Sequence, residues 1–311
     1  MLDVGRLRFF SEVARARSFT EAALRLSYSQ SAVSQQIATL EAELGLILVE
    51  RGTRPLRLTD AGAALLHHAE IIFGEVATAE AALRAIANLD TGLLRVGGFA
   101  SACATLLPGA IARFVRDYPN VSVTLADMQP PFAHRALRAG DLDLAVTYQY
   151  ALAAPAPDDG FQRTALGDDP LVMALPVGHR LARKRSLRLE DLHAETWLST
   201  PAGGPTDRHR QLMEQYCTTA GFQPKIRYEI TDIWIAFGLI AAGLAVGLMP
   251  RLAFLTPHPA ITTRALPDHS PPFRRLYAEH VAQRQIPGVQ PMLNVLQRDV
   301  PRQLALPASP P

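Results

Sequence analysis

The sequence contains little cysteine, with only Cys103 and Cys217 in 311 residues. Two cysteines exclude a scaffold held together by disulfides, and no set of histidines and cysteines has the spacing of a metal site. With 48% hydrophobic and 19% charged residues, the chain can bury real cores. We therefore expect a folded protein of a reducing compartment that needs neither a metal nor a cofactor.

Lysine is also scarce, because only Lys184 and Lys225 accompany the arginines. We attribute this bias to overall composition rather than to chemistry. The formal net charge is only +2, so no basic field covers the whole surface. If the chain binds nucleic acid, binding must depend on where individual arginines sit.

The sequence lacks a secretion signal and a clear membrane span. Charged Asp3, Arg6 and Arg8 interrupt the first ten residues, which therefore cannot form the apolar core of a signal peptide. The most apolar run, 234–250, contains three glycines and favours a helix, a turn and a strand over one span. These features predict a cytoplasmic protein.

Several enzyme signatures are missing. There is no G-x-S-x-G elbow, no phosphate-binding loop and no pair of histidines at metal spacing among the nine. An enzyme built on the α/β part of the chain remains one alternative to a binding protein. A solute-binding protein is another, although it would need a secretion signal.

Three short helices are predicted in the first 45 residues. Apolar residues at helical spacing place the first around Leu7–Ala14. Ser18 and Glu21 have the spacing of a capping box that would start the second. The third begins near Gln30 and ends at Gly45, which can adopt the left-handed conformation of a helix end.

The third helix begins with an unusual polar stretch, "SYSQSAVSQQ", which holds four serines and three glutamines. Ser31 and Gln35 project roughly opposite the apolar Ile37, so the stretch forms an exposed polar face. Two short helices with a tight turn form a helix-turn-helix, whose second helix enters the DNA major groove N-terminus first. Gln can bond both groups of an adenine edge, and Ser can donate or accept. An ordinary solvated helix face remains open on this pattern alone.

A small β-hairpin is predicted next, within "LILVERGTRPLRLTDAG", with its turn at Gly52-Thr53. Arg51, Arg54 and Arg57 cluster around that turn. Such a wing suits contact with the DNA backbone or the minor groove. The alternative is an exposed turn with ordinary surface arginines.

Residues 1–60 resemble the winged helix-turn-helix of the LysR-type transcriptional regulators, over the run from "LRFFSEVARARSFTEAALRLS" through "LTDAG". The resemblance implies that Gln30, Ser31, Ser34 and Gln35 face the bases and that Arg54 lies at the wing tip. The family usually has Pro where Ser31 stands and often Arg where Gln35 stands. The operator preference should therefore differ from that of an arginine-bearing relative.

A long helix is predicted over 61–90, because Thr59–Asn88 holds no proline and only two glycines. Apolar residues recur there at alternating steps of four and three, the pattern of helices that pack along their length. In the resembled family this helix pairs two subunits, so we expect a homodimer or homotetramer. The alternative is an amphipathic helix that packs on its own domain. The predicted seam consists of Leu65, Ala69, Ile72, Val76, Ala79, Leu83 and Ile86.

Strands and helices alternate over 91–300, including a helix over 101–119 and a strand over 169–176, which predicts an α/β fold. We expect two lobes, one of about 91–164 with 265–300 and one of about 165–264, joined by crossing strands. A last helix near Pro287–Arg298 would precede a disordered tail, 301–311. This region resembles the two-lobed effector-binding domain of the same family, which looks like periplasmic binding proteins.

The ends of the predicted strands indicate a small-molecule site between the lobes. Singly, each residue there could equally be a cap or a turn residue. Cys103 and Cys217 raise the alternative of a redox sensor, although an apolar setting favours a core thiol. The expected partners are promoter DNA, an effector and, as a possibility, RNA polymerase. The predicted effector residues are Ala100, Ser101, Gln129, Pro130, Thr147, Thr200, Pro201, Asp232 and Ile233.

Overall fold

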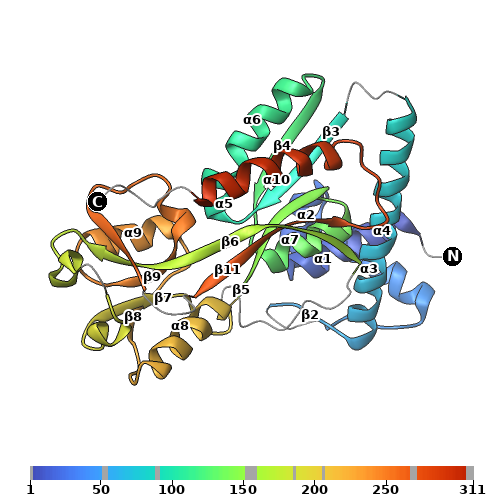
Figure 1. Ribbon diagram of the computed structural model, residues 1–311. Helices are drawn as coiled ribbons and strands as arrows, with labels where there is room; N and C mark the ends of the chain where they lie inside the picture. The colour runs from blue at the N-terminus through green and yellow to red at the C-terminus, as the bar shows by residue number, and fades with distance from the viewer. Residues whose placement is uncertain are drawn as a thin grey trace. The chain divides into compact units, whose positions relative to one another are not determined.

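The computed structural model describes residues 3–50, 55–87, 92–150, 160–184, 187–204, 207–266 and 272–305, without the side chains of 75, 77–87 and 305. Their contacts divide the chain into two compact units, Met1–Glu80 and most of the chain from Ala81 onward. Figure 1 labels the elements of both units. Within the described residues, no helix is both long enough and apolar enough to cross a membrane.

The first unit contains the three predicted helices and the predicted hairpin. The helices are α1 (Val4–Ala16), α2 (Phe19–Leu26) and α3 (Gln30–Leu44). Strands β1 (Val49–Glu50) and β2 (Arg57–Leu58) pair antiparallel. The apolar residues that predicted the helices meet in one core, which includes Phe10, Val13, Val33, Ile37 and Leu40.

Local side-chain bonds set the helix ends. The Ser18 hydroxyl accepts from the Glu21 amide at 3.3 Å, and the Ser29 hydroxyl accepts from the Ala32 amide at 3.1 Å. Gly45 ends α3 at a left-handed φ of 67°. The predicted capping box is only half formed, because the Glu21 carboxylate accepts from Arg25 Nε at 3.1 Å instead of reaching back to Ser18.

The hairpin is anchored to the long helix α4 (Asp60–Ala87) by a close backbone approach. Thr59 Oγ1 donates to the Ile47 carbonyl at 2.7 Å and accepts from the Gly62 amide at 3.0 Å. A Cβ at Gly62 would lie 2.1 Å from the Leu48 carbonyl oxygen. Only glycine fits at this position, so Gly62 allows the hairpin backbone to approach helix α4 closely.

The second unit is built on a seven-stranded sheet with the order β10-β6-β11-β5-β3-β4, to which β9 is added along β6. Strands β3 (Gly92–Gly98), β4 (Val121–Asp127) and β5 (Leu144–Tyr150) are parallel. Strands β6 (Phe161–Pro176) and β11 (Phe273–Val281) run antiparallel to each other and side by side (Figure 1). The strand expected at Asp169–Pro176 is thus the second half of one continuous strand.

The first lobe carries helices α5 (Ala100–Thr105), α6 (Leu107–Asp117), α7 (Pro130–Ala139) and α10 (Val289–Ala305). The single helix expected over 101–119 is therefore two helices. The expected last helix does not stop near Arg298, because α10 continues through Pro301 to Ala305 and packs beside α6. Of the expected disordered tail, 301–305 is thus helical, and 306–311 lies outside the described residues.

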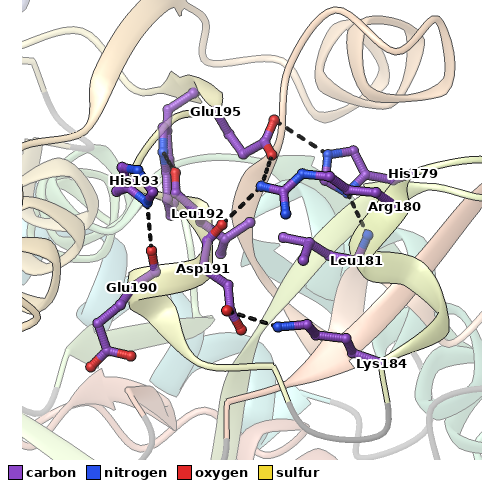
Figure 2. A network of polar contacts seen from close by, with 10 residues as sticks. His179, Arg180, Leu181, Lys184, Glu190, Asp191, Leu192, His193 and Glu195 are labelled. Atoms are coloured by element: carbon purple, nitrogen blue, oxygen red, sulfur yellow. Dashed lines mark hydrogen bonds and ion pairs between the residues drawn. The ribbon is translucent and has the colours of Figure 1, made fainter.

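The second lobe contains the parallel pair β7 (Thr196–Ser199) and β8 (Lys225–Glu229), with helices and strands around it. Figure 2 shows how polar side chains join two of its 3-10 helices, Arg180–Arg183 and Leu189–Leu192. Arg180 Nη2 lies 2.7 Å from Glu195 Oε1, and Lys184 Nζ lies 2.8 Å from Asp191 Oδ1. The remaining elements are α8 (Asp207–Thr219), α9 (Ile233–Ala241), β9 (Gly247–Pro250), β10 (Ile261–Ala265), and the 3-10 helices Arg180–Arg183, Leu189–Leu192 and Arg251–Phe254.

Separate apolar cores fill the two lobes, and β6 contributes to both. Leu166 on β6 packs in the core that holds Phe114 and Leu276. Leu171 on the same strand packs in a different core, around Trp197. A single strand that is buried in both lobes couples them directly, without a loop between.

Candidate DNA-binding surface and effector cavity

The N-terminal tip of α3 presents the polar side chains that the sequence predicts to face DNA. Gln30, Ser31 and Gln35 are exposed, and Ser34 is half-buried. Val33 and Ile37 are fully buried on the inner side of the same helix. The tip therefore has an anchored apolar side and a free polar side.

The polar tip makes few bonds within its own unit. Ser29 and Ser31 share a hydroxyl–hydroxyl bond of 3.0 Å, and Gln30 Oε1 accepts from Thr20 Oγ1 at 3.4 Å, near the limit for a hydrogen bond. The side-chain amide groups can therefore exchange water for the edges of bases at little cost. Arg51 and Arg54 of the wing lie outside the described residues, whereas Arg57 on β2 is exposed.

Part of the apolar seam of the long helix α4 packs within the first unit. Leu65 packs against the core of its own unit, and Ala69 is fully buried. Ile72 is half-buried, and Val76 is 42% exposed. The side chains of Ala79, Leu83 and Ile86 lie outside the described residues. The described exposed part of the predicted seam thus begins at Val76.

A cavity of about 110 Å³ lies in the second unit and is lined by residues from both lobes. We call it the inner cavity. Six of the nine predicted effector residues line it: Ala100, Ser101, Gln129, Thr200, Asp232 and Ile233. Pro130, Thr147 and Pro201 are not among its lining residues. For Thr147 the reason is strand alternation, since Tyr148 and Tyr150 on β5 face the cavity instead.

A second, larger cavity of about 610 Å³ adjoins the first, and we call it the outer cavity. Ala100, Ser101, Gln129, Thr231, Asp232 and Ile233 line both. The outer cavity adds Asp127, Trp234 and His258. The two cavities therefore adjoin each other along these shared residues.

Arg274 organises the floor of the inner cavity, and the sequence patterns did not reveal it. Its Nε donates to Asp169 Oδ2 at 2.9 Å, and its Nη2 donates to the Ser101 hydroxyl at 2.8 Å. The guanidinium also lies 4.5 Å from the Phe99 ring centre and 4.8 Å from that of Tyr148. Arg274 is 4% and Asp169 0% exposed, so the pair is a buried, neutralised unit.

Ser101 does not cap the helix α5. Phe99, not Ser101, occupies the N-cap position, and the helix α5 has only six residues. The Ser101 hydroxyl lies inside that helix and accepts from Arg274. Because Asp169 already neutralises Arg274, the region has no uncompensated positive side chain for a carboxylate.

Two buried polar atoms at the inner cavity have no protein partner. His209 Nε2 lies 2.8 Å from the Leu248 carbonyl oxygen, so this nitrogen must carry the proton and donate. Nδ1 is then an acceptor. Within the part of the chain that the structure describes, neither His209 Nδ1 nor the Ser199 hydroxyl has a hydrogen-bond partner. Such orphaned buried groups indicate a place for a ligand or water.

Burial lowers the pKa of His209 from 6.5 to about 4, so the ring is neutral at physiological pH. The unfolded chain binds a proton between these two values that the folded chain does not bind. Stability should therefore fall as the pH drops from about 6.5 to about 4.

We expect the unfolding free energy of the second unit to lose about 2 kcal/mol from His209 alone between pH 7 and pH 5. Urea titrations at both pH values measure this loss, with His209→Gln as the control, because Gln does not titrate and can still donate to Leu248. An identical pH dependence in both proteins would refute the buried neutral histidine.

Neither cysteine resembles a redox sensor. Burial raises the pKa of Cys103 to about 11, and the thiol donates to the Gly98 carbonyl at 3.2 Å. Burial likewise raises the pKa of Cys217 to about 12. Reactive cysteines need a lowered pKa, so both thiols behave as core side chains.

Comparisons with known proteins identify both domains of the chain. Residues 4–63 match the family described as "Bacterial regulatory helix-turn-helix protein, lysR family", and residues 87–301 match the "LysR substrate binding domain". The chain therefore belongs to the LysR family of transcriptional regulators. It is a regulator with an N-terminal DNA-binding domain and a C-terminal effector-binding domain, not an enzyme.

Individual relatives cover almost the whole chain. The transcriptional dual regulator GltC of Bacillus subtilis is 33% identical over 276 residues, which is 88% of this chain and 89% of GltC. The regulator AlsR of the same organism is 29% identical over 252 residues, 81% of this chain and 82% of AlsR. The crystal structure of CbnR, a LysR family regulator, has a TM-score of 0.66 at 24% identity and covers 96% of this chain and 99% of CbnR.

Proposed function

We propose that this regulator binds its promoter DNA as a homodimer or homotetramer, with the tip of α3 in the major groove and the wing on the backbone. The observation that carries the proposal is the exposed, uncharged tip of α3 beside a fully buried inner side. In this arrangement Gln30, Ser31, Ser34 and Gln35 approach base edges, where Gln can pair with adenine. Arg51 and Arg54 of the wing hold phosphates.

Pairing through α4 supports this mode of binding. One helix tip with few base contacts would bind weakly, and a tethered second tip raises the effective concentration. The exposed Val76 and the continuing apolar pattern at Ala79, Leu83 and Ile86 supply the subunit contact. A crystal structure of full-length CbnR in complex with its target DNA, 25% identical with a TM-score of 0.62, supports a regulator that binds DNA.

The cavities of the second unit are the effector site in this proposal. Strands β6 and β11 connect both lobes, so a ligand between the lobes changes their angle by a small hinge motion. The effector thereby favours one of two arrangements of the DNA-binding domains. We also propose that the regulator contacts RNA polymerase and is located in the cytoplasm.

Gel-shift titrations with the intergenic DNA upstream of the gene test the DNA-binding mode. We expect Gln35→Ala to change which operators are preferred, by a factor of about 5 to 100 at one base pair per half-site. We expect Arg54→Ala to weaken binding to all sequences and to reduce its salt dependence. Equal weakening of every operator by Gln35→Ala would count against base recognition.

A further inference from the structure

The charges around the two cavities are unusual for a site that would take an acidic ligand. Only three charged side chains, Arg274, Asp127 and Asp232, line the cavities among the residues that the structure describes. Arg274 is neutralised by the buried Asp169. The two remaining carboxylates are therefore the charges that an incoming ligand meets.

Both carboxylates line the outer cavity. Burial raises the pKa of Asp127, and the nearby negative charge of Asp232 raises it further. One oxygen of Asp232 caps α9 by accepting from the amides of Trp234, at 2.7 Å, and Ile235, at 3.2 Å. A cation placed between Asp127 and Asp232 would relieve this repulsion.

Aromatic side chains line the outer cavity, where the two carboxylates also lie. Trp234 is 71% exposed although it lines the outer cavity, and its ring lies 5.8 Å from that of Phe237. The ring centre of His258 lies 5.7 Å from that of Phe237. An exposed tryptophan beside carboxylates is a favourable surface for an organic cation.

The unpartnered groups at the inner cavity favour a ligand that carries a hydrogen-bond donor. His209 is 7% and Ser199 1% exposed; both residues line the inner cavity, and each has a buried polar atom without a partner among the described residues. His209 Nδ1 can only accept, because Nε2 donates to Leu248. A carboxylate placed against His209 Nδ1 would face a bare acceptor, whereas an N–H or O–H donor would satisfy it.

We propose that the effector is a small organic amine, with its protonated nitrogen between Asp127 and Asp232 and a second N–H or O–H donor directed at His209 Nδ1. This inference rests on the proposed effector site and adds the chemical class of the ligand. The amine end stacks near Trp234, and the donor end satisfies the buried imidazole. Anionic molecules of the same size and shape should bind more weakly.

Matched probes test the charge and the donor separately. Calorimetric titration of the full-length protein would compare tyramine with 4-hydroxyphenylacetate, and 1,4-diaminobutane with succinate. We expect each amine to bind at least tenfold more tightly than its matched acid. We expect 2-phenylethylamine, which lacks the phenolic donor, to bind about tenfold more weakly than tyramine, because His209 then stays unpaired.

Variants place the binding within the cavities. Asp232→Asn can still cap α9 but removes the charge, so it should weaken tyramine about tenfold and leave neutral tyrosol unchanged. Asp127→Asn should do the same. His209→Gln should remove the preference for tyramine over 2-phenylethylamine. Asp117→Asn, an exposed carboxylate on α6 away from the cavities, is the control and should change none of these affinities.

The outcomes separate the two proposals. If an acid binds as tightly as its matched amine in a manner that depends on His209, the cavities are the effector site but the proposed ligand class is wrong. If none of the probes binds at millimolar concentration, the amine proposal is also overturned. Gel-shift titration in the same samples reports independently whether the protein recognises its operator.

Discussion

Arg274→Met is expected to destabilise the second unit by about 3–5 kcal/mol, because it leaves the carboxylate of Asp169 buried without its partner. The two side chains are bonded at 2.9 Å and are almost completely shielded from water. Met has a similar length and fills the space between Phe99 and Tyr148, so the loss measures charge rather than volume. Urea denaturation followed by circular dichroism measures it.

The neighbouring residue supplies a matched control. Arg275 on the same strand pairs with Asp168 at 2.7 Å, but both side chains are about half exposed. Arg275→Met should therefore change stability little. A second change, Asp169→Asn in the Arg274→Met background, should restore much of the loss because no buried charge remains. Equal stability of the Arg274→Met and Arg275→Met proteins would show that the buried pair does not stabilise the second unit.

Val76→Asp is expected to separate the subunits and to weaken operator binding by at least about a hundredfold. Val76 is the first exposed residue of the seam along α4. Two carboxylates facing each other across a helix pair would be buried without partners. Separate DNA-binding domains also lose the gain from tethering, about 10²–10⁴ in affinity. Sedimentation equilibrium and gel-shift titration measure the two effects.

Ala64→Asp is the control for this prediction, since Ala64 is exposed on α4 within the first unit and is not a member of the seam. It should leave both the mass and the operator affinity unchanged. An unaltered mass of the Val76→Asp protein would refute pairing through this helix and would favour the alternative, in which α4 packs only on its own domain.

The DNA-binding tip could be predicted from the sequence because its determinants are local. The capping hydroxyls of Ser18 and Ser29, the apolar spacing from Val33 to Leu40 and the stop at Gly45 all lie within one short segment. Each acts on its own helix through bonds to residues at most four positions away. Nothing distant has to be known to place Gln35 on the exposed side.

The floor of the cavity could not be predicted in the same way. Arg274 and Asp169 are 105 residues apart and meet only because β11 pairs with β6. Thr147 was expected at the site because it lies at the end of a predicted strand, but the sequence did not show which residues of β5 face the cavity, and Tyr148 and Tyr150 do. His209 sits within α8, where a histidine carries no signal of its own until Leu248 is placed beside it.

The last helix, α10, continues through a proline, because the burial of its apolar side chains outweighs the local preference of proline. Pro301 predicted a stop, because proline removes a helical hydrogen bond and crowds the preceding turn. Leu296, Val300 and Leu304 nevertheless continue at a spacing of four and are all buried in the first-lobe core. The free energy of burying these side chains, about 1.5–3 kcal/mol each, outweighs the cost of one proline.

The central claim, that an uncharged glutamine at the tip of α3 reads adenine, is tested most directly by replacing single operator adenines with 7-deazaadenine. This analogue pairs normally but lacks the N7 acceptor that a bidentate glutamine needs. The account predicts that one substitution per half-site weakens the wild-type protein severalfold and leaves Gln35→Ala unaffected. Equal effects on both proteins at every adenine would contradict it.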